Sequence, residues 1–367
     1  MSKRHHQWRT GFAVSFIAAV VIGQSLAARP ASAAATQFPD QVTVIRYLGG
    51  HGNVACYEIA AALGWLQAKG IKIESEGYSQ GGPESLAAMA AGSVDLAGAA
   101  TPAIINAMAG GAKILGVMPN SGITKNVNSK FFVLANSDIK TALDLKDKSI
   151  AVNTLGAHLD YTTREYLRNH GLKKDAVQLI TVPGPQLDLV LRHKEVDVVA
   201  VGPSIFAGKI AAEGGVRVLF TDYDVLGNIV LGTDAMEKAF IDQHPQAIKD
   251  FVTAAARAAD WTVEHPAEAK KLVAKILAER GDNAALAEYW PGYGLREHAL
   301  YTNHDAQFWI DVLVRGGRLK PGQFTPEHIE TNRYNGLANP SRGDEHGAAS
   351  WSDPDRFRLQ VRPLASP

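Results

Sequence analysis

The chain has 367 residues, and its 37 Lys and Arg balance its 37 Asp and Glu, so its formal net charge is zero at pH 7. No basic block stands out beyond the N-terminal segment, which argues against nucleic acid as a partner. The single cysteine, Cys56, excludes an intramolecular disulfide and a cysteine-rich metal site. About 330 residues beyond a leader are long enough to form two lobes.

The first 35 residues have the order of a secretory signal. Basic residues precede an uncharged and mostly apolar run over 11–27, and small residues follow it. This order predicts a signal peptide over residues 1–35, cleaved after Ala33 or Ala35, and a periplasmic mature protein. An uncleaved membrane anchor is the alternative, because the run approaches the roughly 18 residues that can span a bilayer.

The next part of the chain alternates between strand and helix patterns twice in succession. Strands are predicted at 41–47, 71–76, 94–97 and 114–117, with helices at 54–69, 84–91 and 102–109. A further strand is predicted at 131–135, and after it the second series has strands at 149–153, 177–182, 196–201 and 216–220, with helices at 158–169 and 187–194. Such alternation predicts an α/β fold with mainly parallel sheets covered by helices.

From about residue 245 the pattern becomes mostly helical, with stretches at 246–264, 267–279 and 304–316. A strand at 229–233 is interpreted as the return of the chain to the first series. We therefore expect one lobe over 38–135 and 227–336 and a second lobe over 136–226. The segment 337–367 has little periodicity and is expected to be a disordered or loosely draped tail.

The candidate ligand site lies in the loops that follow the strands, because ligands bind beyond the carboxyl ends of parallel strands. Helix starts there present unpaired N–H groups and a partial positive charge, and glycine lets a ligand approach. These loops therefore predict a small anionic or polar ligand. Each loop could equally be a plain helix cap, and Thr101 before Pro102 is the expected N-cap of its helix. The candidate residues are His51, Asn53, Gly81, Gly82, Thr101, Thr154, Gly156, His158 and Pro203.

A dinucleotide-dependent exported oxidoreductase is a competing hypothesis. The segment from Gly50-His51-Gly52 to Ala55 matches G-x-G-x-x-A between a strand and a helix, and Glu74 or Glu76 ends the next predicted strand. The histidines lack the spacing of a zinc pair, and no nucleophile elbow or Walker loop occurs. We therefore expect no catalytic residues, no metal and no cofactor.

Several segments resemble one family in order and spacing: 90–95, 104–112, 139–152, 194–197 and 331–332. The chain resembles the nitrate/sulfonate/taurine type of ABC-transporter solute-binding protein over roughly 40–335. The resemblance implies a two-lobed, type II periplasmic-binding fold that closes around a small ligand. It also implies a membrane permease and its ATPase as partners, and we expect a monomer. A sensor-linked binding protein would share these features.

The family's ligand loops correspond to Gly81-Gly82-Pro83, Ala157-His158 and Pro203 in this chain. Ala99-Ala100 and Leu155-Gly156 stand where sulfonate-binding relatives carry hydroxyl residues, and Val201-Gly202 replaces a tryptophan before the proline. The resemblance therefore leaves the solute open among sulfonates, taurine-like compounds, carboxylates, aromatic acids and pyrimidines. The related pyrimidine synthases carry a cysteine-rich iron motif, which a single cysteine cannot supply.

Overall fold

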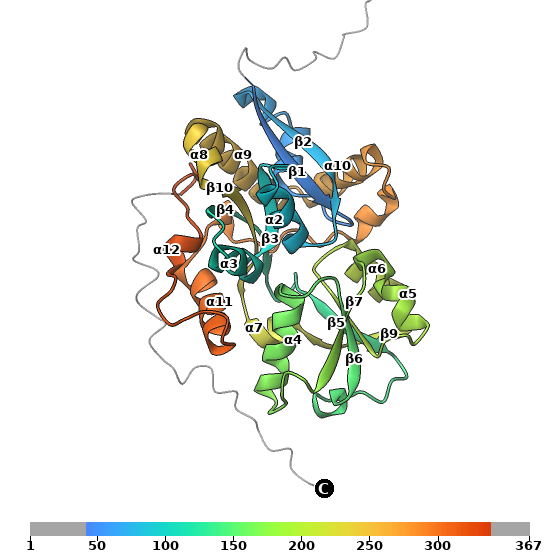
Figure 1. The fold of residues 1–367 in the computed structure, drawn as a ribbon. Coiled ribbons are helices and arrows are strands. Elements are labelled where there is room, and N and C mark those ends of the chain that lie inside the picture. Colours follow the sequence, from blue (N-terminus) through green and yellow to red (C-terminus); the bar gives the residue numbers. More distant parts are fainter. Residues whose placement is uncertain (1–41, 339–367) are drawn as a thin grey trace, which may run out of the picture. The chain divides into compact units, whose positions relative to one another are not determined.

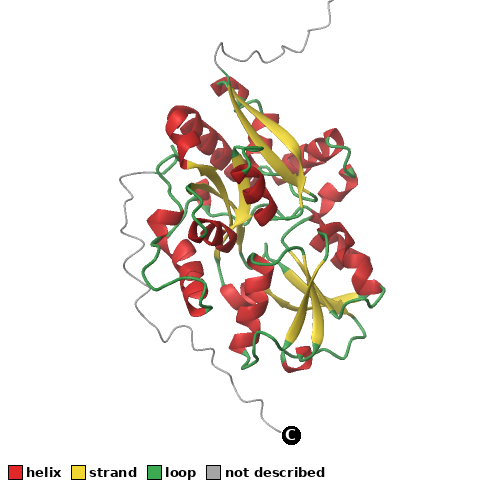
Figure 2. Ribbon diagram, viewed as in Figure 1, coloured by secondary structure: helices red, strands yellow, loops and turns green. Residues whose placement is uncertain are grey.

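The structure is a computed structural model that describes residues 42–338 (Figure 1). The predicted signal peptide over 1–35 lies outside the described residues, as do residues 339–367 of the predicted tail. The described chain contains two five-stranded sheets. Figure 2 shows helices flanking the strands of both. The expectation of an α/β fold with mainly parallel strands is confirmed.

The first sheet has the strand order β2-β1-β3-β10-β4. Its first three strands run parallel, and β10 is antiparallel to both of its neighbours. The strands are β1 Thr43–Gly50, β2 Ile71–Ser79, β3 Leu96–Ala100, β4 Ile114–Ile123 and β10 Ile229–Glu237. The connecting helices are α1 Cys56–Ala62, α2 Gly82–Ala90 and α3 Thr101–Ala109.

The second sheet repeats this plan with the order β7-β6-β8-β5-β9. Here β6 is parallel to β7 and β8, and β5 is antiparallel to β8 and β9. The strands are β5 Lys130–Leu134, β6 Lys148–Val152, β7 Val177–Thr181, β8 Val198–Val201 and β9 Val216–Thr221. The helices are α4 His158–Asn169, α5 Leu187–Arg192, α6 Ile205–Glu213 and α7 Asp222–Leu226.

The helices after β10 pack on the first sheet. Buried Phe251 of α9 shares one apolar core with Tyr57 of α1 and Ile45 of β1. Buried Trp309 of α11 shares another with Ile104 of α3. These late helices are α8 Lys238–Gln243, α9 Pro245–Glu264, α10 Pro266–Glu279, α11 Asn303–Arg315 and α12 Pro326–Ile329.

Some predicted elements differ from the structure. The helix expected over 54–69 is wrong, because α1 ends at Ala62 and Gly64 follows with a left-handed φ of 77°. Helix α6 was not predicted, and β2 continues to Ser79 instead of ending near Glu76.

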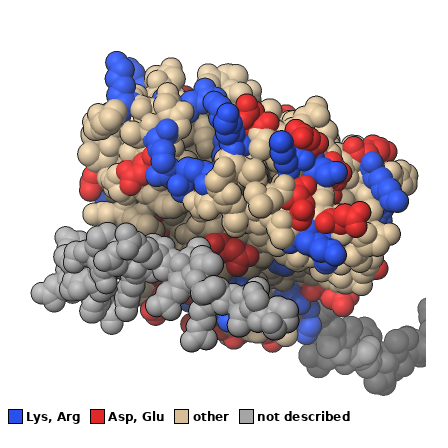
Figure 3. Space-filling view, turned by 90° about the horizontal axis from the view of Figure 1, so that it is seen from below, with Lys and Arg blue, Asp and Glu red and all other residues tan. Residues whose placement is uncertain are grey.

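The surface carries both signs of charge. Lys and Arg lie among Asp and Glu over the face shown in Figure 3, as the balanced composition predicts. Within residues 42–338, the structure has no helix with the length and apolar character needed to cross a membrane.

Candidate functional site

A cavity of about 330 Å³ lies where the carboxyl ends of strands from both sheets approach each other. The chain passes from the first sheet to the second once, between β4 and β5, and returns once, through α7 into β10. Loops after β1, β2 and β3 line one wall, and loops after β6 and β8 line the other. A molecule held in this cavity would therefore touch both groups of elements.

Seven of the nine predicted residues line this cavity: His51, Asn53, Gly81, Gly82, Thr154, His158 and Pro203. Thr101 and Gly156 are not among its lining residues. Thr101 is fully buried, and its hydroxyl lies 3.2 Å from that of Thr233. It is also not the N-cap, because α3 is preceded by Ala100 in that position. Ligand contact by any of the nine residues stays a prediction.

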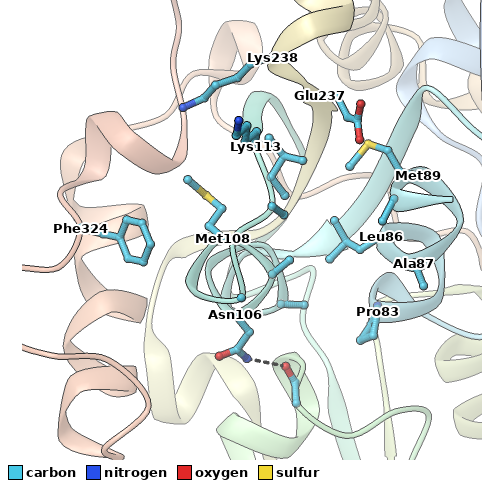
Figure 4. Close-up of a pocket in the computed structure, with 18 of the residues that line it drawn as sticks. Pro83, Leu86, Ala87, Met89, Asn106, Met108, Lys113, Glu237, Lys238 and Phe324 are labelled. Carbon is cyan, nitrogen blue, oxygen red and sulfur yellow. Dashed lines mark hydrogen bonds between the residues drawn. The ribbon is translucent and has the colours of Figure 1, made fainter. Parts of the chain in front are cut away.

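Gly156 borders a second and larger hollow of about 1250 Å³ (Figure 4). Its carbonyl accepts a hydrogen bond from Asn106 Nδ2 at 3.2 Å. Met89, Met108 and Phe324 give this hollow an apolar lining. It lies outside the cavity between the sheets, although the loop containing Gly156 borders both.

His158 begins α4 and is 5% exposed. Its Nε2 lies 2.8 Å from Asp222 Oδ2 and 3.2 Å from Ser129 Oγ, and its Nδ1 lies 3.4 Å from Thr162 Oγ1. Asp222 also accepts the Ser129 N–H at 2.9 Å. Both ring nitrogens thus have protein partners, and the arrangement fixes the start of α4 against β5 and α7.

His51 stacks on Tyr78, with ring centroids 4.2 Å apart and planes 8° from parallel. Its loop is closed by a hydrogen bond from the Asn53 N–H to the Gly50 carbonyl at 3.1 Å. Arg280 donates to the Asn53 carbonyl at 2.8 Å. These contacts hold an aromatic surface at the cavity wall, where a flat solute group could pack.

Helices α2, α4 and α6 all begin at this cavity. Their N-cap residues, Gly81, Ala157 and Ser204, make no side-chain capping bond. The first-turn N–H groups of a helix favour an acceptor or a negative charge. The helix starts therefore suit a polar or anionic group of a solute, as the loops predicted.

Two helix starts carry a buried acid. In α4, Asp160 Oδ2 accepts the Gly156 N–H at 2.8 Å, and in α1 the acid is Glu58. Glu58 Oε2 accepts the Ala55 N–H at 2.7 Å, Oε1 accepts the Tyr47 hydroxyl at 2.6 Å, and the carboxylate pairs with Arg280. A pyrophosphate there would meet this carboxylate. Gly52 offers no space either, because a Cβ would come 2.4 Å from the Phe206 ring.

The acid required by the dinucleotide hypothesis is also poorly placed. Glu74 and Glu76 both lie inside β2, which continues to Ser79, and Glu74 pairs with Lys72 at 2.6 Å. Together with the filled helix start, this geometry does not favour the dinucleotide alternative.

The sequence reasoning missed the polar floor of the cavity, which β10 and β4 provide. Asp234 of β10 is 2% exposed, and its Oδ1 accepts a hydrogen bond from Asn120 Nδ2 at 2.9 Å. Burial raises the pKa of Asp234 to about 7, and the Asn120 bond offsets only part of this shift. The available signal was an acid in the middle of the otherwise apolar segment 229–236.

Two mixed sheets joined by two chain crossings, with a cavity between them, define the fold of a periplasmic-type ligand-binding protein. The chain belongs to the NMT1/THI5-like family, whose profile matches residues 51–269, more than half of its length. No curated protein matches it in sequence. The suspected relationship to ABC-transporter solute-binding proteins is confirmed at the level of family and fold.

Solved structures are similar to this chain over most of its length. The periplasmic aliphatic sulphonate binding protein SsuA from Escherichia coli has a TM-score of 0.60 at 21% identity, covering 78% of this chain and 91% of its own. SsuA from Xanthomonas axonopodis pv. citri, bound to MOPS, gives 0.63 at 18%, with 80% and 99% covered. The periplasmic nitrate-binding protein NrtA from Synechocystis PCC 6803 gives 0.62 at 18%, with 81% and 88% covered.

Proposed function

We propose that this protein is the periplasmic solute-binding component of an ABC uptake transporter. It takes a small anionic or polar organic solute into the 330 Å³ cavity, and its role is binding and not catalysis. The observation that carries the proposal is the placement of this cavity, which is lined from both sheets at the carboxyl ends of their strands. The family membership and the folds of the sulfonate- and nitrate-binding proteins support it.

We further propose two lobes, one for each sheet, that close over the solute by bending at the two crossings. The expected boundary at residue 135 moves to the segment between β4 and β5, because β5 belongs to the second sheet, so the lobes are 42–123 with 229–338 and 130–226. Four polar contacts already join the lobes, one of them the bond from Asn106 Nδ2 to the Gly156 carbonyl described above. Asn153 Nδ2 donates to the Gln80 carbonyl at 3.0 Å, Asn106 Nδ2 to the Tyr161 hydroxyl at 3.0 Å, and Arg315 pairs with Glu165 at 3.0 Å. A solute that contacts both lobes would favour this joined form.

In this proposal the joined form of a monomer docks on a membrane permease driven by a cytoplasmic ATPase, and the exported chain has lost residues 1–35. A pull-down with the membrane fraction tests this partner. Recovery of a permease supports a transporter, and recovery of a membrane receptor instead supports the sensor-linked alternative.

A thermal-shift screen tests the binding function itself. Sulfonates, carboxylates, nitrate and pyrimidines are added to the purified mature chain. A solute at 100 times its Kd should stabilise the folded state by about 2.7 kcal/mol. The proposal fails if none of these compounds raises Tm while NAD or FAD does.

A further inference from the structure

The cavity between the lobes is acidic in its ionisable side chains. Its described lining residues include two acids, Glu58 and Asp234, and no Lys or Arg. Glu58 is compensated by Arg280 and by two hydrogen bonds. Asp234 has one hydrogen bond, from Asn120. The two acids therefore differ in how well the protein itself satisfies them.

Asp234 Oδ2 has no hydrogen-bond partner within the described chain, although the residue is 98% buried. The amide of Asn120 is held in its orientation, because its Oδ1 accepts the Ser121 hydroxyl at 2.9 Å and its Nδ2 donates to Asp234 Oδ1. It therefore does not supply a partner for Asp234 Oδ2. A buried carboxyl oxygen without a partner is destabilising. Its presence in a cavity wall indicates that the missing partner comes with the solute.

A second polar group in the same wall is also unsatisfied. The Tyr293 hydroxyl is buried and has no nitrogen or oxygen partner among the described residues. Its ionisable neighbours are the thiol of Cys56, which is a weak hydrogen-bonding group, the guanidinium of Arg280 and the carboxyl of Asp234. Two unpartnered acceptors, Asp234 Oδ2 and the Tyr293 oxygen, thus belong to one region of the cavity.

Glycine keeps this region open to the solute. Gly98 of β3 lies directly opposite Asp234 of β10 in the sheet, and both line the cavity. A Cβ on Gly98 would come 3.2 Å from Asp234 Oδ1 and 3.4 Å from Asn120 Nδ2. Even a methyl group at this position would crowd the carboxyl.

We propose that the solute presents an N–H-bearing nitrogen, as an amine, an amidine or an amino-substituted ring, to Asp234 Oδ2 and the Tyr293 hydroxyl. This inference rests on the proposed solute-binding function and narrows its solute class. The remaining polar part of the solute lies toward the starts of α2, α4 and α6. Nitrate or a simple sulfonate can accept the Tyr293 O–H but would leave Asp234 Oδ2 unsatisfied, and its negative charge would meet a carboxyl group in a lining without Lys or Arg.

Matched probe pairs that differ in the nitrogen group test the inference by calorimetric titration. The pairs are taurine with ethanesulfonate, benzamidine with benzoate, and 4-aminopyrimidine with pyrimidine. We expect the nitrogen-bearing member of at least one pair to bind at least tenfold more tightly than its partner. Asp234→Asn should weaken that binding at least tenfold, because the amide presents N–H groups to a donor.

Two further variants complete the design. Gly98→Ala keeps the carboxyl of Asp234 but crowds it, so it should weaken binding of the same probe. This variant tests the inference if Asp234→Asn fails to fold. Asp311→Asn makes the same chemical change on the exposed face of α11 and should leave affinity unchanged. Equal binding of a nitrogen-bearing probe by the wild type, Asp234→Asn and Gly98→Ala overturns the inference.

The outcomes also separate the inference from the function. If ethanesulfonate, benzoate or nitrate binds the wild type and Asp234→Asn equally well, while no nitrogen-bearing probe binds more tightly, solute binding stands and the nitrogen inference falls. If no probe of either kind binds the wild type, the proposed function falls, and the inference falls with it.

Discussion

Burial disfavours the ionised form of Asp234, which is the form whose Oδ2 would accept an N–H group from the solute. Its pKa is about 7 in the folded protein, against an ordinary value of 3.8. The ionisable groups around it are Cys56, Tyr57, Tyr293 and Tyr301, and burial raises the pKa of each well above its usual value. These neighbours therefore stay neutral near pH 7, and Asp234 is the group of this cluster that titrates there.

The sign of the resulting pH dependence follows from proton binding. Between about pH 4 and 7 the folded chain holds a proton that the unfolded chain releases, so Asp234 makes stability fall by about 1.4 kcal/mol per pH unit. The loss levels off above pH 7. Asp234→Asn should remove this component, so its stability relative to the wild type should rise from pH 4 to 7. Urea unfolding at pH 4, 5, 6, 7 and 8 measures the difference, and a constant difference would contradict the expectation.

His158 connects three elements through hydrogen-bond contacts with Ser129 and with Asp222, which is fully buried. Removing one partner of such a pair leaves a buried carboxylate poorly compensated. We expect His158→Ala to lower the free energy of unfolding by about 3 kcal/mol. His193→Ala, at a side chain that is 62% exposed, is the control and should change it by less than about 0.5 kcal/mol. An unchanged stability with lost solute affinity would instead identify His158 as a direct ligand.

At the scale of elements, the sequence predicts those helices whose bounds are determined by residues close by in the chain. Helix α4 has the predicted bounds, 158–169, because its apolar face is periodic and a glycine follows shortly after its end. Helix α6 has little polar periodicity and contains Gly208, which packs on the backbone and Cβ of Tyr289. Its stability depends on this distant neighbour, which a short sequence window does not reveal.

The same distinction applies to the site. Ligands bind beyond the carboxyl ends of parallel strands, so the loops there could be chosen from sequence, and seven of the candidate residues line the cavity. Asp234 lies inside a strand, and its burial depends on β10 being placed between β3 and β4. That strand order brings together residues more than 100 positions apart, so no local motif could have revealed this floor.

The close approach of Gly52 to Phe206 of α6 allows the packing between the loop after β1 and α6 to be tested. Gly52 and Gly64 both have left-handed φ angles, 71° and 77°, but only Gly52 would place a Cβ against a neighbour. Both alanine variants should suffer the backbone strain of about 1 kcal/mol. Gly52→Ala should lose a further 1–3 kcal/mol, roughly, from overpacking against Phe206. Chemical denaturation of both variants measures this, and equal losses would show that the Phe206 ring moves aside.

At the scale of the whole molecule, the proposed closure would depend on contacts that lie outside the solute cavity. Asn106 bonds to the Gly156 carbonyl and the Tyr161 hydroxyl across the two proposed lobes. Asn106→Ala should shift the equilibrium toward an open form and weaken solute binding several-fold without touching the solute. Small-angle scattering should show a larger radius of gyration. An unchanged radius of gyration and affinity would show that the Asn106 bonds do not stabilise the closed form. The ion pair of Glu165 with Arg315 would then be tested with Glu165→Gln.

The strand order also constrains how the chain folds. Strands β3 and β4 are separated by β10, which the chain supplies only after the whole second sheet has been completed. Pairings of such long sequence separation form slowly, and unpaired strand edges are prone to aggregation in the meantime. A chain that folds from its N-terminus thus keeps two incomplete edges in its first sheet until residue 229 and its successors are available. Because the same late strand carries Asp234, the solute pocket acquires its floor only at the final stage of sheet assembly, and partly folded chains should be unable to capture solute.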